Sequence, residues 1–175
     1  LPDFLSRAEQ FLNRPEAILP APPAPPDWRN ATAFRWRKSA NGRGWLQAVK
    51  QPHPMRLKDL KDIDDQKSRV DANTRQFVSG HPANNVLLTG TRGSGKSSLI
   101  KALLNEYAKK GLRLIEVDKA DLVDLPDIVD MIDGRPERFI IFCDDLSFEA
   151  GDPSYKALKV ILDGSIAAPP DNVLI

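Results

Sequence analysis

The sequence feature that most constrains this chain is a glycine-rich octapeptide, GTRGSGKS, at residues 90–97. It matches the pattern G-x-x-x-x-G-K-[ST] at every position, and it stands between an apolar run at residues 86–88 and a segment with helical apolar spacing. Glycines at this density permit positive φ values and let several backbone N–H groups approach one anion. A helix that begins near Lys96 would direct its N-terminal N–H groups at the same anion. The octapeptide therefore predicts a loop that holds the phosphates of a nucleotide.

The side chains at the end of the octapeptide have specific expected roles. Lys96 would reach the β and γ phosphate oxygens, and the Ser97 hydroxyl would coordinate Mg²⁺. We therefore expect ATP and Mg²⁺ as the bound groups. The residues of this segment expected to bind nucleotide are Gly90, Thr91, Arg92, Gly93, Ser94, Gly95, Lys96, Ser97 and Ser98.

Two aspartates, Asp144 and Asp145, follow directly after the apolar run at residues 139–143. A strand that is apolar throughout is typical of a parallel sheet covered on both faces, and ligands bind at the carboxyl ends of such strands. One carboxylate can hold the Mg²⁺ hydration shell while its neighbour orients or deprotonates a water. The alternative is simple turn chemistry, which the nearby octapeptide makes the weaker interpretation.

The order of apolar patterns predicts an α/β fold with a mainly parallel sheet flanked by helices. Expected strands are residues 86–88, 112–117, 139–143 and a fourth that begins at Val173. Expected helices are residues 65–79, a segment from about Lys96 that closes at Gly111, residues 125–132, and a segment capped by Asp152 and Pro153.

The part before this core differs in composition. Residues 2–13 have the spacing of a short amphipathic helix, and residues 15–26 hold six prolines, which predicts an extended linker. Alternating residues around an Asn-Gly turn then predict a β-hairpin. We therefore divide the chain into a helix and linker (1–26), a hairpin (27–56) and a nucleotide-binding core (57–175) that we expect to be incomplete at its C-terminal end.

The hairpin region carries most of the chain's asymmetry of charge. Residues 28–58 contain eight Lys or Arg and no acidic residue, whereas the whole chain has a net charge of +1. Four aromatic residues lie among these cations: Trp28, Phe34, Trp36 and Trp45. Such a surface could stack bases and neutralise phosphates, so nucleic acid is a candidate partner. The alternative, which we favour, is that the aromatic face packs against the domain and the basic face is solvated.

Other compositional features indicate a cytoplasmic protein that does not span a membrane. The chain has one cysteine, Cys143, so it contains no internal disulfide framework. No apolar run approaches the ~20 residues of a membrane span, and the beginning lacks the pattern of a signal peptide. We expect Cys143 to be an inert core thiol, and His53 and His81 lack the spacing of zinc ligands.

The octapeptide and the segment at residues 139–145 together resemble the AAA+ ATPases. The stretch at residues 57–67, with Asp59-Leu60 and Ile63-Asp64, looks like the segment that cups adenine in that family. More narrowly, residues 82–88 and 138–149 resemble a bacterial group of AAA+ ATPases whose biological role is uncharacterised. The resemblance extends from about Phe34 to Ile175, and it implies the P-loop fold of that family.

By this resemblance, Lys96 contacts phosphate, Ser97 and Asp144 hold Mg²⁺, Ile63 lies at the adenine, and Asp145 stands in the place of the catalytic glutamate. An Asp-Asp pair, in place of the usual Asp-Glu, implies slow, switch-like hydrolysis, which Glu149 could assist. The family's first sensor, arginine finger and lid would lie beyond Ile175. The family also implies a homo-oligomer, in which a neighbouring subunit completes each site.

Three functions remain open on the sequence alone. The leading one is a Mg-dependent ATPase that couples nucleotide state to conformational change or assembly. The alternative is a nucleotide-gated nucleic-acid-binding protein of the loader type, with little hydrolysis of its own. A small-molecule kinase is disfavoured, because the acidic stretch at residues 118–133 lacks the arginines that a kinase lid needs.

Overall fold

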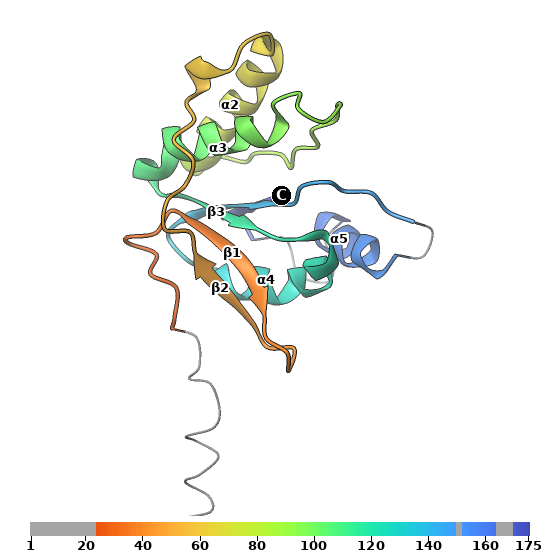
Figure 1. Ribbon diagram of the computed structural model, residues 1–175. Coiled ribbons are helices and arrows are strands. Elements are labelled where there is room, and N and C mark those ends of the chain that lie inside the picture. The colour runs from red at the N-terminus through yellow and green to blue at the C-terminus, as the bar shows by residue number, and fades with distance from the viewer. Residues whose placement is uncertain (1–23, 150–151, 164–169) are drawn as a thin grey trace, which may run out of the picture.

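The computed structural model describes residues 24–149, 152–163 and 170–175, and shows an α/β fold built on one five-stranded, mostly parallel sheet (Figure 1). The strands are β1 (Ala33–Lys38), β2 (Gly44–Ala48), β3 (Leu112–Glu116), β4 (Arg138–Phe142) and β5 (Val173–Leu174). Their order across the sheet is β2-β1-β3-β4-β5, and only the β1–β2 pair is antiparallel. The expected helix at residues 2–13 and most of the proline-rich linker lie outside the described residues.

Helices cover both faces of the sheet (Figure 1). One face packs against α2 (Asp64–Val78) and α3 (Lys96–Tyr107), and the other against α4 (Leu125–Ile132) and α5 (Pro153–Asp163). Short 3-10 turns precede or follow these helices: η1 (Leu57–Asp59), η2 (Ala108–Lys110) and η3 (Lys119–Asp124). The expected helices at residues 65–79 and 125–132 are therefore confirmed.

The largely apolar pattern of the central strands follows from this two-sided burial. Leu114 and Ile140 belong to the core beneath α2 and α3, whereas Ile115 and Ile141 belong to the core that packs on α4 and α5. Successive side chains of a strand point to opposite faces, so a strand covered on both faces is mostly apolar. Arg113 is the buried exception in β3, and its guanidinium donates to the Trp28 carbonyl. The sequence pattern at residues 112–117 and 139–143 therefore predicted these strands correctly.

The hairpin is part of this sheet and not an appendage to it. β1 pairs in parallel with β3, with Phe34 opposite Ile115, and antiparallel with β2, with Trp36 opposite Leu46. The division that we drew at residue 56, between the hairpin and the core, therefore corresponds to no break in the sheet. The alternating pattern fixed the hairpin itself, but a hairpin's neighbour in a sheet depends on distant residues.

The expected strand at residues 86–88 is the main point at which the structure differs from the sequence analysis. This segment forms no strand, although Val86 N–H donates to the carbonyl of Ile175 at 2.9 Å beside β5. The Ile175 N–H donates to the Asn85 Oδ1 at 2.9 Å, and not to a backbone carbonyl. A parallel strand pair would need a second backbone hydrogen bond here, from the Ile175 N–H to a carbonyl. The Asn85 side chain accepts that N–H instead, so the segment is not paired as a strand.

The described helices are also too short or too polar for a bilayer. The 15-residue α2, for example, is shorter than the ~20 apolar residues that a span needs. Within the described ranges, no helix is long and apolar enough to cross a membrane.

Candidate functional site

The glycine-rich loop, residues 90–97, leads directly into α3. Gly95 is the N-cap of that helix and has a φ of 89°, and Gly93 has a φ of 83°. Both values lie in the left-handed region, which glycine adopts without steric cost. No side chain caps α3 by a hydrogen bond, and its first turn carries no acidic residue. The first N–H groups of α3 are therefore available to an anion, which the helix dipole would also favour.

The Lys96 side chain folds back over this loop. Its Nζ donates to the carbonyl of Gly90 at 2.8 Å and to that of Thr91 at 2.9 Å. These two contacts hold a positive charge at the mouth of the loop, beside the N-terminus of α3. The arrangement gives the loop both backbone donors and a cation on the same side.

Ser97 and Asp144 are 47 residues apart in sequence but are joined in the fold. The Ser97 hydroxyl donates to Asp144 Oδ2 at 2.6 Å. Ser97 is placed by the first turn of α3, and Asp144 by the end of β4. Hydroxyl and carboxylate oxygens are ligands that suit Mg²⁺, which is usually bound by one or two carboxylates together with waters and substrate phosphates. The donor set at this point therefore fits the expected ion.

The described residues contain no group of three or more His, Cys, Asp or Glu arranged to hold a metal. A Mg²⁺ ion at Ser97 and Asp144 would thus depend on further oxygen ligands from water and from a nucleotide.

Asp145 has an unusual backbone conformation. Its φ is 55°, one of two positive values among the non-glycine residues that the structure describes, and its N–H donates to Asp144 Oδ1 at 3.0 Å. Aspartate enters this region more readily than most residues, but the conformation still costs on the order of 1 kcal/mol. The turn directs the chain away from the line of β4 and leaves the Asp145 side chain exposed. Glu149 is also exposed, further along the same segment.

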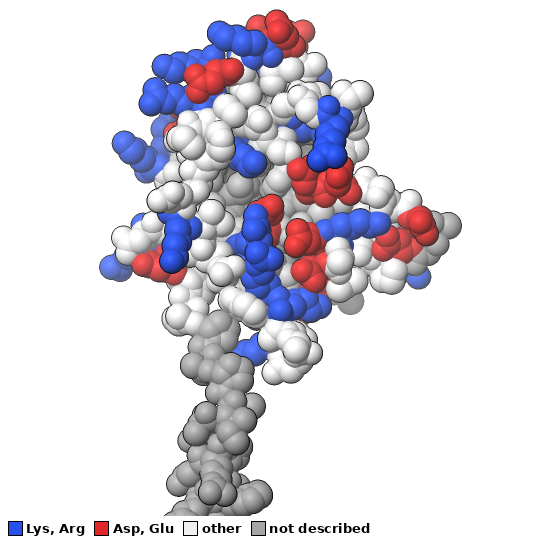
Figure 2. Space-filling view, in the orientation of Figure 1, with Lys and Arg blue, Asp and Glu red and all other residues white. Residues whose placement is uncertain are grey.

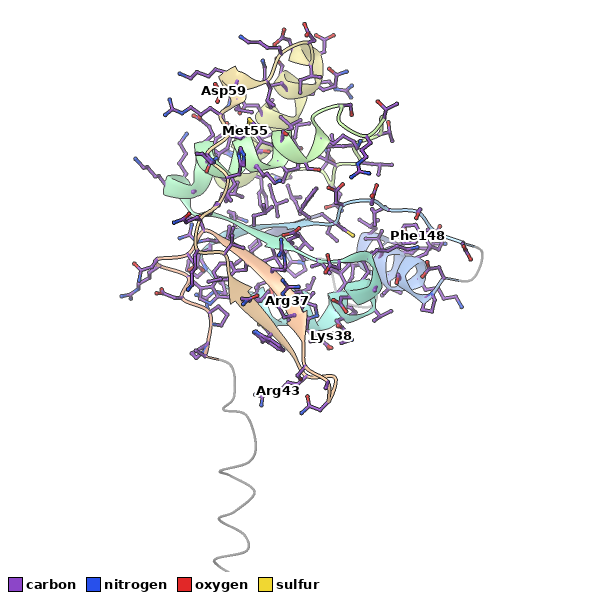
Figure 3. All side chains as sticks on the ribbon, in the orientation of Figure 1. Arg37, Lys38, Arg43, Met55, Asp59 and Phe148 are labelled. Carbon is purple, nitrogen blue, oxygen red and sulfur yellow. The ribbon has the colours of Figure 1, made fainter. Side chains whose placement is uncertain are left out.

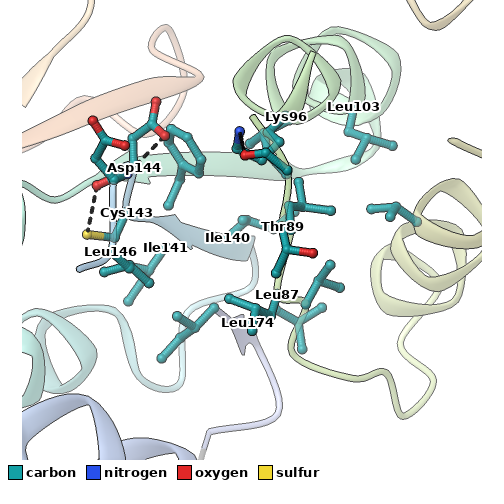
Figure 4. Close-up of a pocket in the computed structure, with 18 of the residues that line it drawn as sticks. Leu87, Thr89, Lys96, Leu103, Ile140, Ile141, Cys143, Asp144, Leu146 and Leu174 are labelled. Atoms are coloured by element: carbon teal, nitrogen blue, oxygen red, sulfur yellow. Dashed lines mark hydrogen bonds between the residues drawn. The ribbon is translucent and has the colours of Figure 1, made fainter. Parts of the chain in front are cut away.

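A cavity of about 440 Å³ opens beside the loop (Figure 4). Five of the predicted site residues line it, and Arg92 is one of them; the other four are Gly90, Lys96, Asp144 and Asp145. Leu87, Leu103, Ile140 and Leu174 contribute an apolar wall. The segment at residues 86–88, where a strand was expected, also lines the cavity.

The structure also brings Ile63 to the loop. A Cβ added to Gly95 would lie 3.7 Å from Ile63 Cδ1, so the two residues are neighbours. Ile63 immediately precedes α2. Ser98 is half-buried in the first turn of α3, next to Ser97. The expected binding residues therefore gather around the start of α3, although they come from three separate segments.

Sequence reasoning missed the contribution of α2. Asn73 donates to the carbonyl of Asn84 at 2.8 Å and accepts from the Asn84 N–H at 2.9 Å. This pair attaches the segment that precedes the glycine-rich loop to α2, and Asn73 and Thr74 line the cavity. Asn73 belongs to no local motif, so only the fold reveals its role.

Comparison with protein families gives one match. Residues 29–175 match the family described as "Protein of unknown function (DUF815)". The chain belongs to this family. The match includes the glycine-rich loop and both aspartates, so the arrangement described above lies wholly within the DUF815 region. Neither the curated proteins nor the solved structures contain a match to the chain.

Cys143, between β4 and the aspartates of this DUF815 chain, is a partly buried thiol packed against the core of α4 and α5. Burial raises its pKa to about 11, and the negative charges of Asp118 and Asp144 add to the effect. The thiol is therefore protonated at neutral pH and is a poor nucleophile. This agrees with the expectation of an inert core thiol.

The aromatic residues of the hairpin region are packed inside the fold. Trp28, Phe34 and Trp36 are 9%, 1% and 3% exposed, and the Trp28 ring lies 4.5 Å from Phe34 between ring centroids. Trp36 Nε1 donates to Asp124 Oδ2 at 2.9 Å. These three rings offer no face to a base, so the favoured alternative, an aromatic face packed against the domain, is confirmed for them. Trp45 is partly exposed.

The basic residues of the hairpin lie on the outside, and two of them are paired. Arg35 contacts Glu116 at 2.6 Å and Lys38 contacts Asp124 at 2.9 Å. Figure 3 shows Arg37 and Lys38 along the hairpin and Arg43 near its tip. Part of the positive charge of residues 28–58 is thus used within the fold.

Proposed function

We propose that this chain binds Mg-ATP at the glycine-rich loop and hydrolyses it, as an ATPase of the AAA+ type with a P-loop fold. The observation that carries the proposal is the 2.6 Å hydrogen bond between Ser97 and Asp144. Ser97 was expected to hold Mg²⁺ from the octapeptide. One of the two aspartates after the apolar strand was expected to do so as well, and the resemblance assigns that role to Asp144. A shared location was not required by either pattern alone.

The other features of the site are consistent with this proposal. Uncapped N–H groups at the start of α3 and the Lys96 ammonium both favour a phosphate group near the loop. A bound Mg²⁺ would supply positive charge that neutralises the phosphate oxygens. Ser97 and Asp144 would hold that ion, and Lys96 would leave the carbonyls of Gly90 and Thr91 to contact phosphate.

Asp145 is the proposed base or orienting group for the attacking water. It is the second carboxylate after β4, and its left-handed φ sets it apart from Asp144. Aspartate is one methylene shorter than the glutamate common in AAA+ proteins, so we propose slow hydrolysis that serves as a switch. We further propose that the chain acts as a homo-oligomer, in which a neighbouring subunit supplies the cation that completes the site.

The loader alternative is less well supported. Its base-stacking surface would have required exposed rings at Trp28, Phe34 and Trp36, and these rings are buried. We therefore do not propose stacking of single strands as the function of the hairpin.

The test compares two lysines on the same helix. Lys96→Ala should weaken binding of Mg-ATP by at least about tenfold in isothermal titration calorimetry, because it removes the cation at the phosphates. Lys101→Ala, on the exposed side of α3, is the matched control and should bind as the wild type does. Unchanged binding by Lys96→Ala would overturn the proposal.

The same proteins allow hydrolysis to be measured. The rate of ATP hydrolysis per molecule should rise with protein concentration if neighbouring subunits complete each site, and Lys96→Ala should abolish it. A rate per molecule that is independent of concentration would contradict the sharing of sites between subunits.

A further inference from the structure

A second hollow, of about 560 Å³, lies at the opposite end of α3 from the glycine-rich loop. Four cations line it, Arg56, Lys58, Arg75 and Lys110, together with two carboxylates, Asp71 and Glu106. We call this feature the basic hollow. The helix rises ~1.5 Å per residue, so the eleven steps from Lys96 to Tyr107 place the two sites about 16 Å apart.

One of the two carboxylates in the basic hollow is already satisfied. Asp71 accepts a hydrogen bond from the Tyr107 hydroxyl at 2.6 Å and from Arg75 at 2.8 Å, one on each oxygen. Burial and this contact raise the pKa of Tyr107 to about 12, so the hydroxyl keeps its proton near neutral pH. Asp71 is thereby paired with Arg75, and each of its oxygens already accepts a hydrogen bond.

The remaining cations have no such partner. Among the residues that the structure describes, Arg56, Lys58 and Lys110 form no ion pair, and all three are exposed. Glu106 is the other carboxylate that lines the hollow, and the Asp59 carboxylate lies on the same turn as Arg56 and Lys58. Figure 2 shows Lys and Arg side chains gathered over this part of the molecule, around α2 and the segment before it. Like charges held together favour an anion between them.

The backbone that carries two of these cations is fixed to α3. The Asn105 side-chain amide donates to the carbonyls of His53 and Met55, each at 2.7 Å. Arg56 N–H then donates to Asp59 Oδ2 at 3.0 Å, which closes the η1 turn. Met55 and Asp59, at the two ends of this segment, are labelled in Figure 3. Arg56 and Lys58 therefore project from a braced turn and not from a free loop.

Lys110 is held in place from the other side. Its Nζ lies 5.1 Å from the centroid of the Tyr107 ring, within the range of a cation–π contact. The hydroxyl of the same tyrosine binds Asp71, so Tyr107 fixes both a cation and a carboxylate of the hollow. Its ring is 3% exposed, which leaves it no face for stacking a base.

We propose that the basic hollow is a second anion site, which binds the phosphate groups of a polyphosphate or of a nucleic-acid backbone independently of the glycine-rich loop. Several cations with hydrogen-bond donors suit a phosphate, which offers several acceptor oxygens at one point. Without an exposed ring in the hollow, recognition rests on phosphate and not on base. This site uses Arg56 and Lys58 from the basic stretch of the sequence, whose charge the hairpin does not neutralise.

The test replaces two lysines of the basic hollow with glutamate and, as a control, two lysines of α5. The double variant Lys58→Glu/Lys110→Glu changes net charge as much as Lys156→Glu/Lys159→Glu, which alters exposed lysines on α5. Two probes distinguish the sources of phosphate: tripolyphosphate, followed by calorimetry, and a short fluorescein-labelled oligothymidylate, followed by anisotropy. Both are added without ATP, and far-ultraviolet circular dichroism checks that each variant is folded.

The wild type should bind at least one probe, and the hollow variant should bind it at least about tenfold more weakly, while the α5 variant changes less than about twofold. If the probe is the oligonucleotide, the salt dependence of binding should also become shallower, by ~1.4 in the log–log slope for two lost contacts. Binding of the oligonucleotide identifies a nucleic-acid backbone as a ligand, and binding of tripolyphosphate alone identifies a small polyphosphate.

Three results would overturn the proposal. The wild type could bind neither probe, or both double variants could lose affinity equally, which would indicate net charge alone. Tripolyphosphate binding could also persist in the hollow variant and be lost in Lys96→Ala, which would place it at the glycine-rich loop. That last result would support the proposed nucleotide site, so the two proposals fail separately.

Discussion

In the sequence, the glycine-rich loop and the basic hairpin both suggested contact with phosphate. The two regions differ in which groups would make that contact. In the loop, the expected chemistry belongs to the backbone, and Gly93 and Gly95 have the positive φ values that the glycine-rich pattern predicts. In the hairpin, the expected chemistry belonged to side chains, and Phe34 and Trp36 face the core. A glycine pattern constrains the backbone conformation directly, whereas a composition leaves open which face its side chains take.

The basic residues of the segment at residues 28–58 also differ in whether they are paired with an acid. Arg35 is paired with Glu116 of β3 and Lys38 with Asp124 of η3. Arg56 and Lys58, by contrast, meet cations of α2 and η2 in the basic hollow. These four residues belong to one run of sequence without acids. The residues that surround each cation are distant in sequence. The run by itself therefore does not indicate which of its cations are paired with an acid.

The largest expected effect concerns Trp36, and it tests whether the hairpin aromatics serve the core. Trp36→Ala should lower the free energy of unfolding by about 3–5 kcal/mol, because it leaves a cavity beneath the sheet. The variant also removes the hydrogen bond to Asp124. Trp45→Ala is the control and should cost less than half as much, since Trp45 is partly exposed. Urea denaturation followed by circular dichroism measures both, and equal losses would contradict the contrast.

Cys143 gives the next largest effect, because it lies one residue from the site aspartates but belongs to the core. Its pKa of about 11, against an ordinary 9.0, reduces the thiolate fraction near pH 8 by about a hundredfold. A thiolate of higher pKa is also more nucleophilic, which offsets part of this loss, so the native thiol should react with a disulfide reagent at least about tenfold more slowly than the unfolded thiol. A native rate close to the unfolded rate would show that Cys143 is an accessible group of the site.

The raised pKa of Cys143 also has a consequence for stability. The folded state holds the thiol proton more tightly than the unfolded state, so this contribution to stability is complete below about pH 9 and is lost as the pH rises towards about 11. Cys143→Ala should remove this part of the alkaline decrease in unfolding free energy.

The smallest of the three effects separates the roles of the two aspartates. Asp144→Asn should weaken the Mg²⁺ dependence of ATP binding by about tenfold, which corresponds to about 1.4 kcal/mol, while binding without Mg²⁺ changes little. Asp145→Asn should leave that dependence nearly intact and lower the rate of hydrolysis. Calorimetry at varied Mg²⁺ concentration measures the first and phosphate release the second. Equal effects of both substitutions on Mg²⁺ would contradict the assignment of the metal to Asp144.

Local patterns predicted much of the fold. The apolar runs of β3 and β4, the spacing of α2 and α4, and the alternation in β1 and β2 were all visible in the sequence, since each depends on which faces are buried. The segment at residues 86–88 was predicted as a strand and is not one. Its apolar residues match the pattern of a buried strand. The Ile175 N–H, however, donates to the Asn85 side chain and not to a backbone carbonyl of this segment.

The sequence by itself determined the glycine-rich loop, the α/β class and the position of Asp144 and Asp145 after a buried strand, because those features arise from neighbours in the chain. Only the tertiary structure decided that Ser97 meets Asp144, that β1 pairs with β3 and that Arg56 shares a hollow with Lys110. Each of these joins segments dozens of residues apart, and their meeting depends on the order of strands and the packing of helices. Propensity and spacing act over a few residues and carry no information on that order.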